Sequence, residues 1–301
     1  MSSHLEHILT TIGNIHPEHA SKLSGNNSYL NGAYTSMAES FFGKYEAYLH
    51  KINKTIDFGV SCYLHMHDDM LEERIKFIQT GSYSSTSFVE VERRVYGNPE
   101  IMTYHMHGLV LAQFLWFEQY ERIKFFCDNL NKYATSCTQY LEIGGGHGLY
   151  LNEALKLLHS TRRFDLVDIS ESSLQLAKGI INDPDVNYYL KNIFDFPDDT
   201  TYDFVTMGEV LEHVEDPLSL LKKISKLIGA HGTAYITTPV NAPMIDHIYL
   251  FKNAGEIRDV FTAAGLEILE EKIVISEHID QKKAEKFKVP VMFAAFAKNK
   301  I

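Results

Sequence analysis

Four residues in one short stretch carry the strongest chemical signal in this sequence. Glu142 is followed by Gly144, Gly146 and Gly148, which stand between an apolar segment and a helix-like stretch that begins at Leu149. Glycine lets the backbone adopt positive φ angles and approach a ligand closely, because no Cβ stands in the way. The stretch therefore predicts a ligand-binding turn.

A glycine-rich turn of this kind leaves two ligands open. Dinucleotide-binding proteins seat a pyrophosphate at such a turn, but their third glycine would fall at residue 149 rather than at Gly148. The carboxylate of Glu142 would repel a pyrophosphate, yet it suits the amino group of a methionine moiety. We therefore favour S-adenosylmethionine (SAM), and an NAD-dependent oxidoreductase is the alternative.

Three further motifs follow in order, each after a predicted strand. Asp168 closes the second strand, Asn192-Ile193-Phe194-Asp195-Phe196-Pro197 follows the third, and Met207 to Pro217 follows the fourth. With these motifs the sequence resembles the class I SAM-dependent methyltransferases over roughly residues 130–300.

The resemblance implies a role for each matching residue. Gly144, Gly146 and Gly148 would cradle the cofactor and Glu142 would orient its amino acid end. Asp168 would take both ribose hydroxyls, because a carboxylate offers only acceptors. Asn192 stands where the family usually has an aspartate, so Asp195 is an alternative. The expected cofactor-binding residues are Glu142, Gly144, Gly146, Gly148, Asp168, Asn192, Ile193 and Glu209.

Methyl transfer from a sulfonium mainly requires alignment of the acceptor and exclusion of water. A general base is needed only where the acceptor must first lose a proton. The proline-punctuated loop from Thr237 to His247 follows the fifth strand, at the edge where open α/β sheets bind ligands. We predict His247, beside Asp246, as this base; the alternative is a loop histidine bonded to backbone. His213 is interpreted as a helix-face residue.

Two His-Met-His triplets, His65 to His67 and His105 to His107, stand in the N-terminal part. On a helix, residues i and i+2 point in nearly opposite directions, so neither pair can chelate one ion. One histidine of each triplet could still converge with Asp68. We expect no metal site.

Short apolar strands alternate with amphipathic helical segments from Thr138 onward, which predicts an α/β fold. The resemblance makes it a Rossmann-like, seven-stranded, mostly parallel sheet with helices on both faces. We expect strands at residues 139–143, 164–168, 186–190, 203–207, 233–237, 266–275 and 291–298. The SAM-binding domain should span residues 131–301.

Residues 1–130 show helical periodicity without strands, and we expect a helical cap that selects the acceptor. Helices are predicted over residues 37–52, 70–78 and 101–130, besides 216–228 and 252–264 in the α/β part. The run from Leu109 to Phe117 is apolar on all sides, which favours a helix sandwiched between the two parts. The small polar residues 80–87 suggest a hinge that lets the cap close over SAM.

The composition limits the partners. The formal net charge of −11 gives no basic surface for nucleic acid, and no apolar run is long enough to span a membrane. Three cysteines without paired spacing and a start unlike a signal peptide favour the cytoplasm. The segments LEHVEDP and TTPVN are similar to methyltransferases of quinone and natural-product biosynthesis. We therefore expect a small-molecule methyl acceptor; a catalytically silent SAM-binding scaffold is the second alternative.

Overall fold

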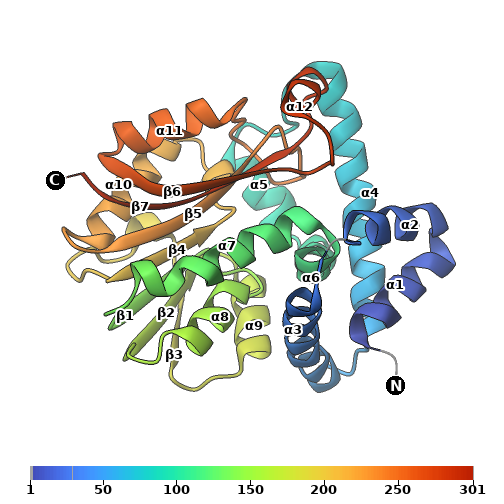
Figure 1. The fold of residues 1–301 in the computed structure, drawn as a ribbon, viewed down its shortest axis with the longest axis horizontal. Coiled ribbons are helices and arrows are strands. Elements are labelled where there is room, and N and C mark those ends of the chain that lie inside the picture. Colours follow the sequence, from blue (N-terminus) through green and yellow to red (C-terminus); the bar gives the residue numbers. More distant parts are fainter. Residues whose placement is uncertain (1–2, 29, 301) are drawn as a thin grey trace.

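The computed structural model describes residues 3–28 and 30–300, which form a seven-stranded sheet with helices on both faces and a group of N-terminal helices at one end (Figure 1). The strand order is β3-β2-β1-β4-β5-β7-β6. Strands β1 to β5 are parallel, and β7 runs antiparallel to both of its neighbours. The predicted fold is confirmed.

All seven predicted strands are present, and their ends differ by at most three residues from the prediction. The strands are β1 (Gln139–Ile143), β2 (Arg163–Asp168), β3 (Val186–Leu190), β4 (Phe204–Gly208), β5 (Thr233–Val240), β6 (Leu266–Ile275) and β7 (Val291–Asn299). β5 is longer than expected because it continues through Pro239, which pairs with Met292 of β7.

Side chains of each central strand alternate between two hydrophobic cores, as the pleat of a strand requires. In β1, Tyr140 belongs to the core shared with the N-terminal helices, and Leu141 and Ile143 belong to the other. The first face is covered by α7 (Phe117–Tyr133), α8 (Leu149–Leu157) and α9 (Glu171–Ile181), and the second by α10 (Pro217–Ile228) and α11 (Ala254–Ala263). Asp216 caps α10, accepting a hydrogen bond from the Ser219 amide at 3.1 Å.

The N-terminal helices stand mostly at the right of the sheet in Figure 1, where α5 alone is seen within the outline of the sheet. They are α1 (His4–Ile15), α2 (Pro17–Asn26), α3 (Gly32–Lys51), α4 (Ile56–Thr80), α5 (Phe88–Val91) and α6 (Pro99–Leu115), with a π-helical turn at Glu92–Tyr96; the short helices Ile193–Asp195, Leu211–His213 and α12 (Gln281–Lys286) complete the description. We refer to α1 to α6 as the cap. Among the described residues, no helix is both long and apolar enough to cross a membrane.

One long helix was expected over residues 101–130, but the structure has two. Trp116 adopts an extended conformation (φ −99°, ψ 118°) between α6 and α7, so the chain turns there. The apolar run predicted to be sandwiched is indeed buried: Val110, Leu111, Phe114 and Leu115 are all inaccessible to solvent.

The expected division between residues 130 and 131 falls inside α7, which packs against β5, β6 and β7. A single core cluster also joins the cap to the sheet, with Phe41 and Phe114 on one side and Tyr140 and Phe204 on the other. That the two parts are separate domains stays a prediction.

The segment expected to be a hinge, residues 80–87, is anchored by two of its residues, although Thr80, Ser82, Ser84 and Thr86 are exposed. Tyr83 and Ser85 are buried, with 5% and 1% of their surfaces exposed. The Tyr83 hydroxyl accepts a hydrogen bond from the Ala242 amide at 3.0 Å, and Ser85 accepts one from Arg94 at 2.7 Å. These contacts tie the segment to the loop after β5.

Candidate functional site

A cavity of about 870 Å³ lies where the carboxyl ends of β1, β2, β4 and β5 meet the cap. Its floor includes the turn after β1 and Asp168 at the end of β2. The cap residues Met102 and Met106, together with Trp116 between α6 and α7, also line it. Open α/β sheets bind ligands at this edge, so the topology brings the predicted motifs together.

The turn after β1 has the conformation that the glycine spacing predicted. Gly144 and Gly146 adopt φ angles of +64° and +53°, which side-chain-bearing residues rarely accept. A Cβ on Gly144 would lie 2.4 Å from a methyl group of Val210, and one on Gly146 would point toward Met106 at the cavity. Both glycines line the cavity, so the backbone itself forms that wall.

Gly148 differs from its expected role as a cofactor contact. It precedes the first residue of α8 with φ +74°, its amide donates a hydrogen bond to the Gly145 carbonyl, and it does not line the cavity. A Cβ here would lie 2.6 Å from Ile181. Gly148 therefore serves to turn the chain into α8.

Glu142 lines the cavity, and only 2% of its surface is exposed. Burial raises the pKa of its carboxyl group to about 8, and the nearby Asp168 adds to the shift. The Tyr140 hydroxyl lies 3.4 Å from one carboxylate oxygen. A buried acid of this kind gains from a cationic partner, which is what an amino group would provide.

Asp168 lies across the turn from Glu142. One of its oxygens accepts a hydrogen bond from the Gly146 amide at 3.2 Å, and the other accepts one from the Ser170 amide at 2.8 Å. Burial raises the pKa of Asp168 to about 6, although these amide bonds oppose the shift. The backbone bonds fix the carboxylate in the cavity wall.

Asn192 and Ile193 line the cavity as expected, whereas the alternative Asp195 is exposed and does not. The Asn192 side-chain oxygen accepts a hydrogen bond from the Phe194 amide at 3.0 Å and thereby caps the short helix that follows. The neighbouring Phe194 also lines the cavity, with 45% of its surface exposed. Exposed apolar surface beside a cavity suits the flat face of a nucleoside's heterocyclic base.

Glu209 reaches the cavity through a left-handed backbone conformation (φ +53°) directly after β4. Its carboxylate forms an ion pair with Arg122 of α7 and accepts a hydrogen bond from Thr237 at 2.9 Å. Arg122 is buried, and its Nε–H has no hydrogen-bond partner among the described residues. Glu209 thus positions a guanidinium group that faces the cavity.

His247, predicted to be the base, lies in the cavity wall with 7% of its surface exposed. Its Nδ1–H donates a hydrogen bond to the Ala242 carbonyl at 2.6 Å. Burial, aided by the nearby His213, lowers the pKa of its ring to about 3. A neutral ring held in this way presents Nε2 as an acceptor.

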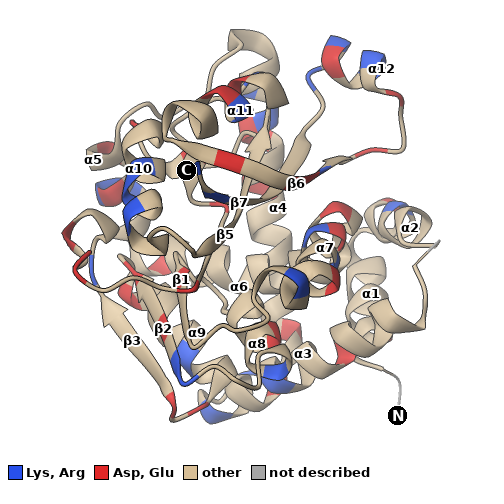
Figure 2. Ribbon diagram, turned by 60° about the vertical axis from the view of Figure 1, so that its left-hand side comes forward, with Lys and Arg blue, Asp and Glu red and all other residues tan. Residues whose placement is uncertain are grey.

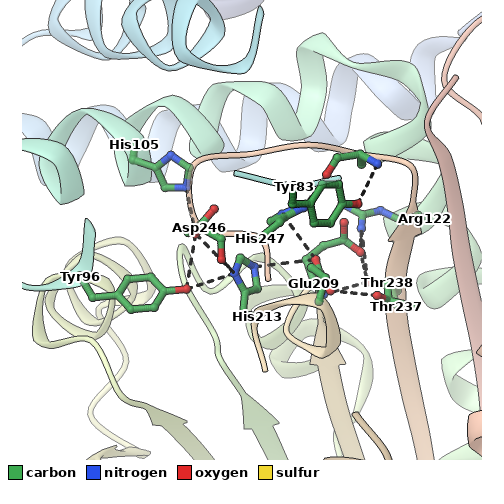
Figure 3. A network of polar contacts seen from close by, with 12 residues as sticks. Tyr83, Tyr96, His105, Arg122, Glu209, His213, Thr237, Thr238, Asp246 and His247 are labelled. Atoms are coloured by element: carbon green, nitrogen blue, oxygen red, sulfur yellow. Dashed lines mark hydrogen bonds and ion pairs between the residues drawn. The ribbon is translucent and has the colours of Figure 1, made fainter. Parts of the chain in front are cut away.

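His213 also lies in the cavity wall, which corrects its interpretation as an ordinary helix-face residue. Its Nδ1–H donates to the Asp246 carbonyl at 3.0 Å, with the Tyr96 hydroxyl at 3.1 Å from the same nitrogen (Figure 3). The rings of His213 and His247 meet edge to face with centroids 4.8 Å apart.

Asp246 connects this group to the cap. Its Oδ2 lies 3.5 Å from His213 and 3.5 Å from His105 of α6 (Figure 3). Burial opposes ionisation of this carboxyl, but the neighbouring His213 and His105 outweigh it and lower its pKa. His105 is the one residue of the two triplets that reaches this cluster; His65 stacks on Tyr104, and His107 bonds to Tyr45.

The sequence did not indicate that Arg122 or Tyr96 reaches this site, and it singled out His105 only as part of a triplet, because each lies on a helix far from the motifs. His213 and Asp246 could have been found from the sequence. His213 directly follows Glu212 in the segment after the fourth strand, and Asp246 directly precedes His247 in the loop after the fifth strand. Their convergence depends on the loop after β5, whose Ile248 and Tyr249 amides donate hydrogen bonds to the Glu212 carbonyl at 2.9 Å each.

The fold and this cavity define a methyltransferase domain of the SAM-dependent class. The chain belongs to that family: the model described as "Methyltransferase domain" matches residues 117–271, which is just over half of the chain. The family resemblance and the SAM cofactor predicted from the sequence are thereby confirmed, and the NAD-dependent alternative is disfavoured.

Among curated proteins, the chain is similar to ubiquinone biosynthesis O-methyltransferases. It is 25% identical to the mitochondrial protein of Dictyostelium discoideum over 149 residues, covering 42% of this chain and 46% of that protein. It is 28% identical to the protein of Xanthomonas campestris over 107 residues, covering 34% and 44% of the two chains. The chain thus spans less than half the length of these relatives.

Among solved structures, mitomycin 7-O-methyltransferase MmcR has a TM-score of 0.52 at 11% identity, covering 77% of this chain and 68% of that chain. The N-methyltransferase NodS of Bradyrhizobium japonicum, in complex with S-adenosylhomocysteine, has a TM-score of 0.48 at 15% identity, covering 70% and 98%. The likeness to MmcR supports the fold.

Proposed function

We propose that the protein transfers a methyl group from SAM to a hydroxyl group of a small molecule bound between the sheet edge and the cap. The observation that carries this proposal is that one cavity contains both the glycine turn with Asp168 and the cluster of His213, Asp246 and His247. The first part suits a nucleoside with an amino acid tail, and the second suits a polar acceptor.

The cofactor half is assigned from the chemistry of its groups. SAM supplies an electrophilic methyl group on a positively charged sulfur. We propose that Asp168 accepts the ribose hydroxyls, that Glu142 faces the amino group, and that the Arg122 guanidinium pairs with the carboxylate. Gly144 and Gly146 leave room for these contacts, while Asn192 and Ile193 border the base.

The acceptor half is enclosed by the cap. Its apolar wall includes Met102, Leu109, Trp116, Met244 and Met292, so an acceptor with an apolar body and one reactive hydroxyl fits best. His213 and His247 present their Nε2 atoms close to where that hydroxyl must lie. The O-methyltransferase names of the curated relatives support an oxygen acceptor.

A small molecule suits this site better than nucleic acid. Lys and Arg are scattered among Asp and Glu over many elements rather than gathered in a stripe (Figure 2), and the net charge is −11. We also propose a cytoplasmic location, which Cys62, Cys127 and Cys137, all free thiols, support.

The test is the formation of S-adenosylhomocysteine from SAM with a panel of phenols, catechols, aliphatic alcohols and amines. We expect turnover with hydroxyl acceptors that carry an apolar body. Turnover only with amines would overturn the choice of oxygen. Tight SAM binding without turnover on any acceptor would instead support a silent scaffold.

A further inference from the structure

Three acceptor atoms converge beside the cavity with no donor among them. The Glu212 Oε1 atom lies 3.8 Å from Nε2 of His213 and 3.9 Å from Nε2 of His247. One possible ligand atom from each of the three residues lies within 4.8 Å of the other two. These separations are too long for hydrogen bonds.

The two imidazole rings are fixed with their Nε2 lone pairs toward this point. In each ring, Nδ1–H donates to a backbone carbonyl, that of Asp246 for His213 and that of Ala242 for His247. A carbonyl can only accept, so in the neutral form of each ring the proton lies on Nδ1 and Nε2 carries the lone pair. Histidines that bind metals are held by the same kind of bond from their second nitrogen.

Glu212 provides the second, independent observation. Its side chain is inaccessible to solvent, and Oε1 has no hydrogen-bond partner among the described residues. The other oxygen, Oε2, accepts a hydrogen bond from Thr238 at 2.9 Å, which aims Oε1 at the two rings. A buried carboxylate oxygen without a donor costs free energy unless a cation occupies the space before it.

We propose that Glu212, His213 and His247 form a binding site for a divalent transition-metal ion, with Zn²⁺ as the ion that fits best. Two imidazoles and one carboxylate are a ligand set found in catalytic zinc sites. Nitrogen ligands also favour zinc, iron or nickel over magnesium and calcium. The expectation of no metal, which considered only the two triplets, is replaced by this proposal.

The spacing suits such an ion after the two rings move inward. Ligand atoms about 2.0–2.1 Å from a tetrahedral ion lie roughly 3.4 Å apart. Each Glu212–histidine distance would shorten by a few tenths of an ångström, and the distance between the two histidine nitrogens, which is at most 4.8 Å, would shorten by up to about 1.4 Å. Because Glu212 lies beneath the cavity wall while both histidines line the cavity, the fourth coordination position faces the cavity. Asp246, whose Oδ1 has no hydrogen-bond partner in the described part of the chain, lies beside His213 as an additional negative charge.

The role of the ion rests on the proposed function, although the site itself rests on geometry alone. A hydroxyl of the acceptor in the fourth position would lose its proton to water more readily, because the ion stabilises the oxyanion. The oxygen–carbon bond to the methyl group then forms as the sulfur–carbon bond of SAM breaks, leaving S-adenosylhomocysteine. No oxidant or reductant is required.

The experiment measures binding of metal to the full chain, independently of turnover. Protein stripped with a chelator and dialysed is titrated with Zn²⁺ by calorimetry, and with Co²⁺ by visible absorption, whose intensity and position report tetrahedral nitrogen and oxygen ligands. We expect one ion per chain. In Glu212→Gln and His247→Gln, affinity should fall at least roughly tenfold.

Glu118→Gln is the matched control, since Glu118 is another buried acid that lines the same cavity but lies outside this cluster. It should bind metal like the unchanged protein. Binding of S-adenosylhomocysteine and the melting temperature are measured for all variants to show that they fold. If the unchanged protein binds no ion, or if Glu212→Gln binds as well as Glu118→Gln, the metal site is wrong, while retained cofactor binding leaves the proposed function standing.

Discussion

The Arg122 guanidinium on α7 forms an ion pair with Glu209, which follows β4. The pair joins the helix that leads out of the cap to the strand at the centre of the sheet. Burial opposes the charge on Arg122, but Glu209 outweighs it and raises the pKa of the guanidinium further. The wall of the cavity therefore holds a permanent positive charge, and its buried Nε–H has no hydrogen-bond partner among the described residues.

Replacing Arg122 with Gln should weaken binding of S-adenosylhomocysteine by at least about tenfold, because a charge-assisted hydrogen bond contributes roughly 1.5–3 kcal/mol. Calorimetry on the free cofactor measures this. Adenosine, which lacks the amino acid tail, serves as the internal control and should bind both proteins equally. Equal loss for adenosine would show that Arg122 supports the cavity rather than the carboxylate.

Asp168→Asn should lower cofactor affinity by roughly tenfold to a hundredfold, since a neutral amide accepts weaker hydrogen bonds from two ribose hydroxyls than a carboxylate does. Asp195→Asn is the matched control, because Asp195 is exposed outside the cavity. It should bind the cofactor like the unchanged protein. A comparable loss at Asp195, or none at Asp168, contradicts the assignment.

The sheet could be predicted from the sequence because its signals are local. Each strand is a short apolar run, and Gly144, Gly146 and Asp168 stand at strand ends that parallel topology brings to one edge. The break at Trp116 escaped prediction because no proline or glycine marks it. The apolar periodicity continues across it, and only packing between α6 and α7 decides the turn.

The acceptor half was only partly predictable for a related reason. His247 was found through its position after the fifth strand. The other members of the cluster come from three other segments: His213 contacts His247, Tyr96 contacts His213, and His105 contacts Asp246. The spacing of these residues in the sequence does not indicate that they lie close together in the fold. Burial could not be predicted either. An acidic residue such as Glu212 is expected at the surface from its sequence, yet it is inaccessible to solvent in the fold.

A chain that starts near residue 98 should fail to fold cooperatively and should lose methyl transfer. The cap and the sheet share one apolar core, so removal of α3 and α4 would expose Phe114 and its neighbours on α6 to water. Size-exclusion chromatography and thermal unfolding by circular dichroism measure this. Cooperative unfolding with undiminished turnover would show instead that residues 98–301 fold independently of α1 to α5 and that these helices do not close the site.

The affinity for S-adenosylhomocysteine should rise between pH 6 and pH 8. Burial raises the pKa of Glu142 to about 8 in the ligand-free protein, so a proton must leave its carboxyl before the carboxylate can pair with the cofactor's ammonium group. Calorimetry in buffers of different ionisation enthalpy should detect this proton release. In Glu142→Gln, the affinity should be weaker and should vary less with pH.

The raised pKa of the Glu142 carboxyl group also predicts how the stability of the ligand-free protein depends on pH. A folded-state pKa raised above the unfolded value favours folding below the unfolded pKa of 4.5, and this contribution is lost as pH rises toward 8. The melting temperature of Glu142→Gln, whose side chain stays neutral, should therefore gain on that of the unchanged protein as pH increases from 5 to 8. Other buried acids titrate in both proteins and cancel in the difference. A difference that is constant over this range would mean that Glu142 is already ionised without the cofactor.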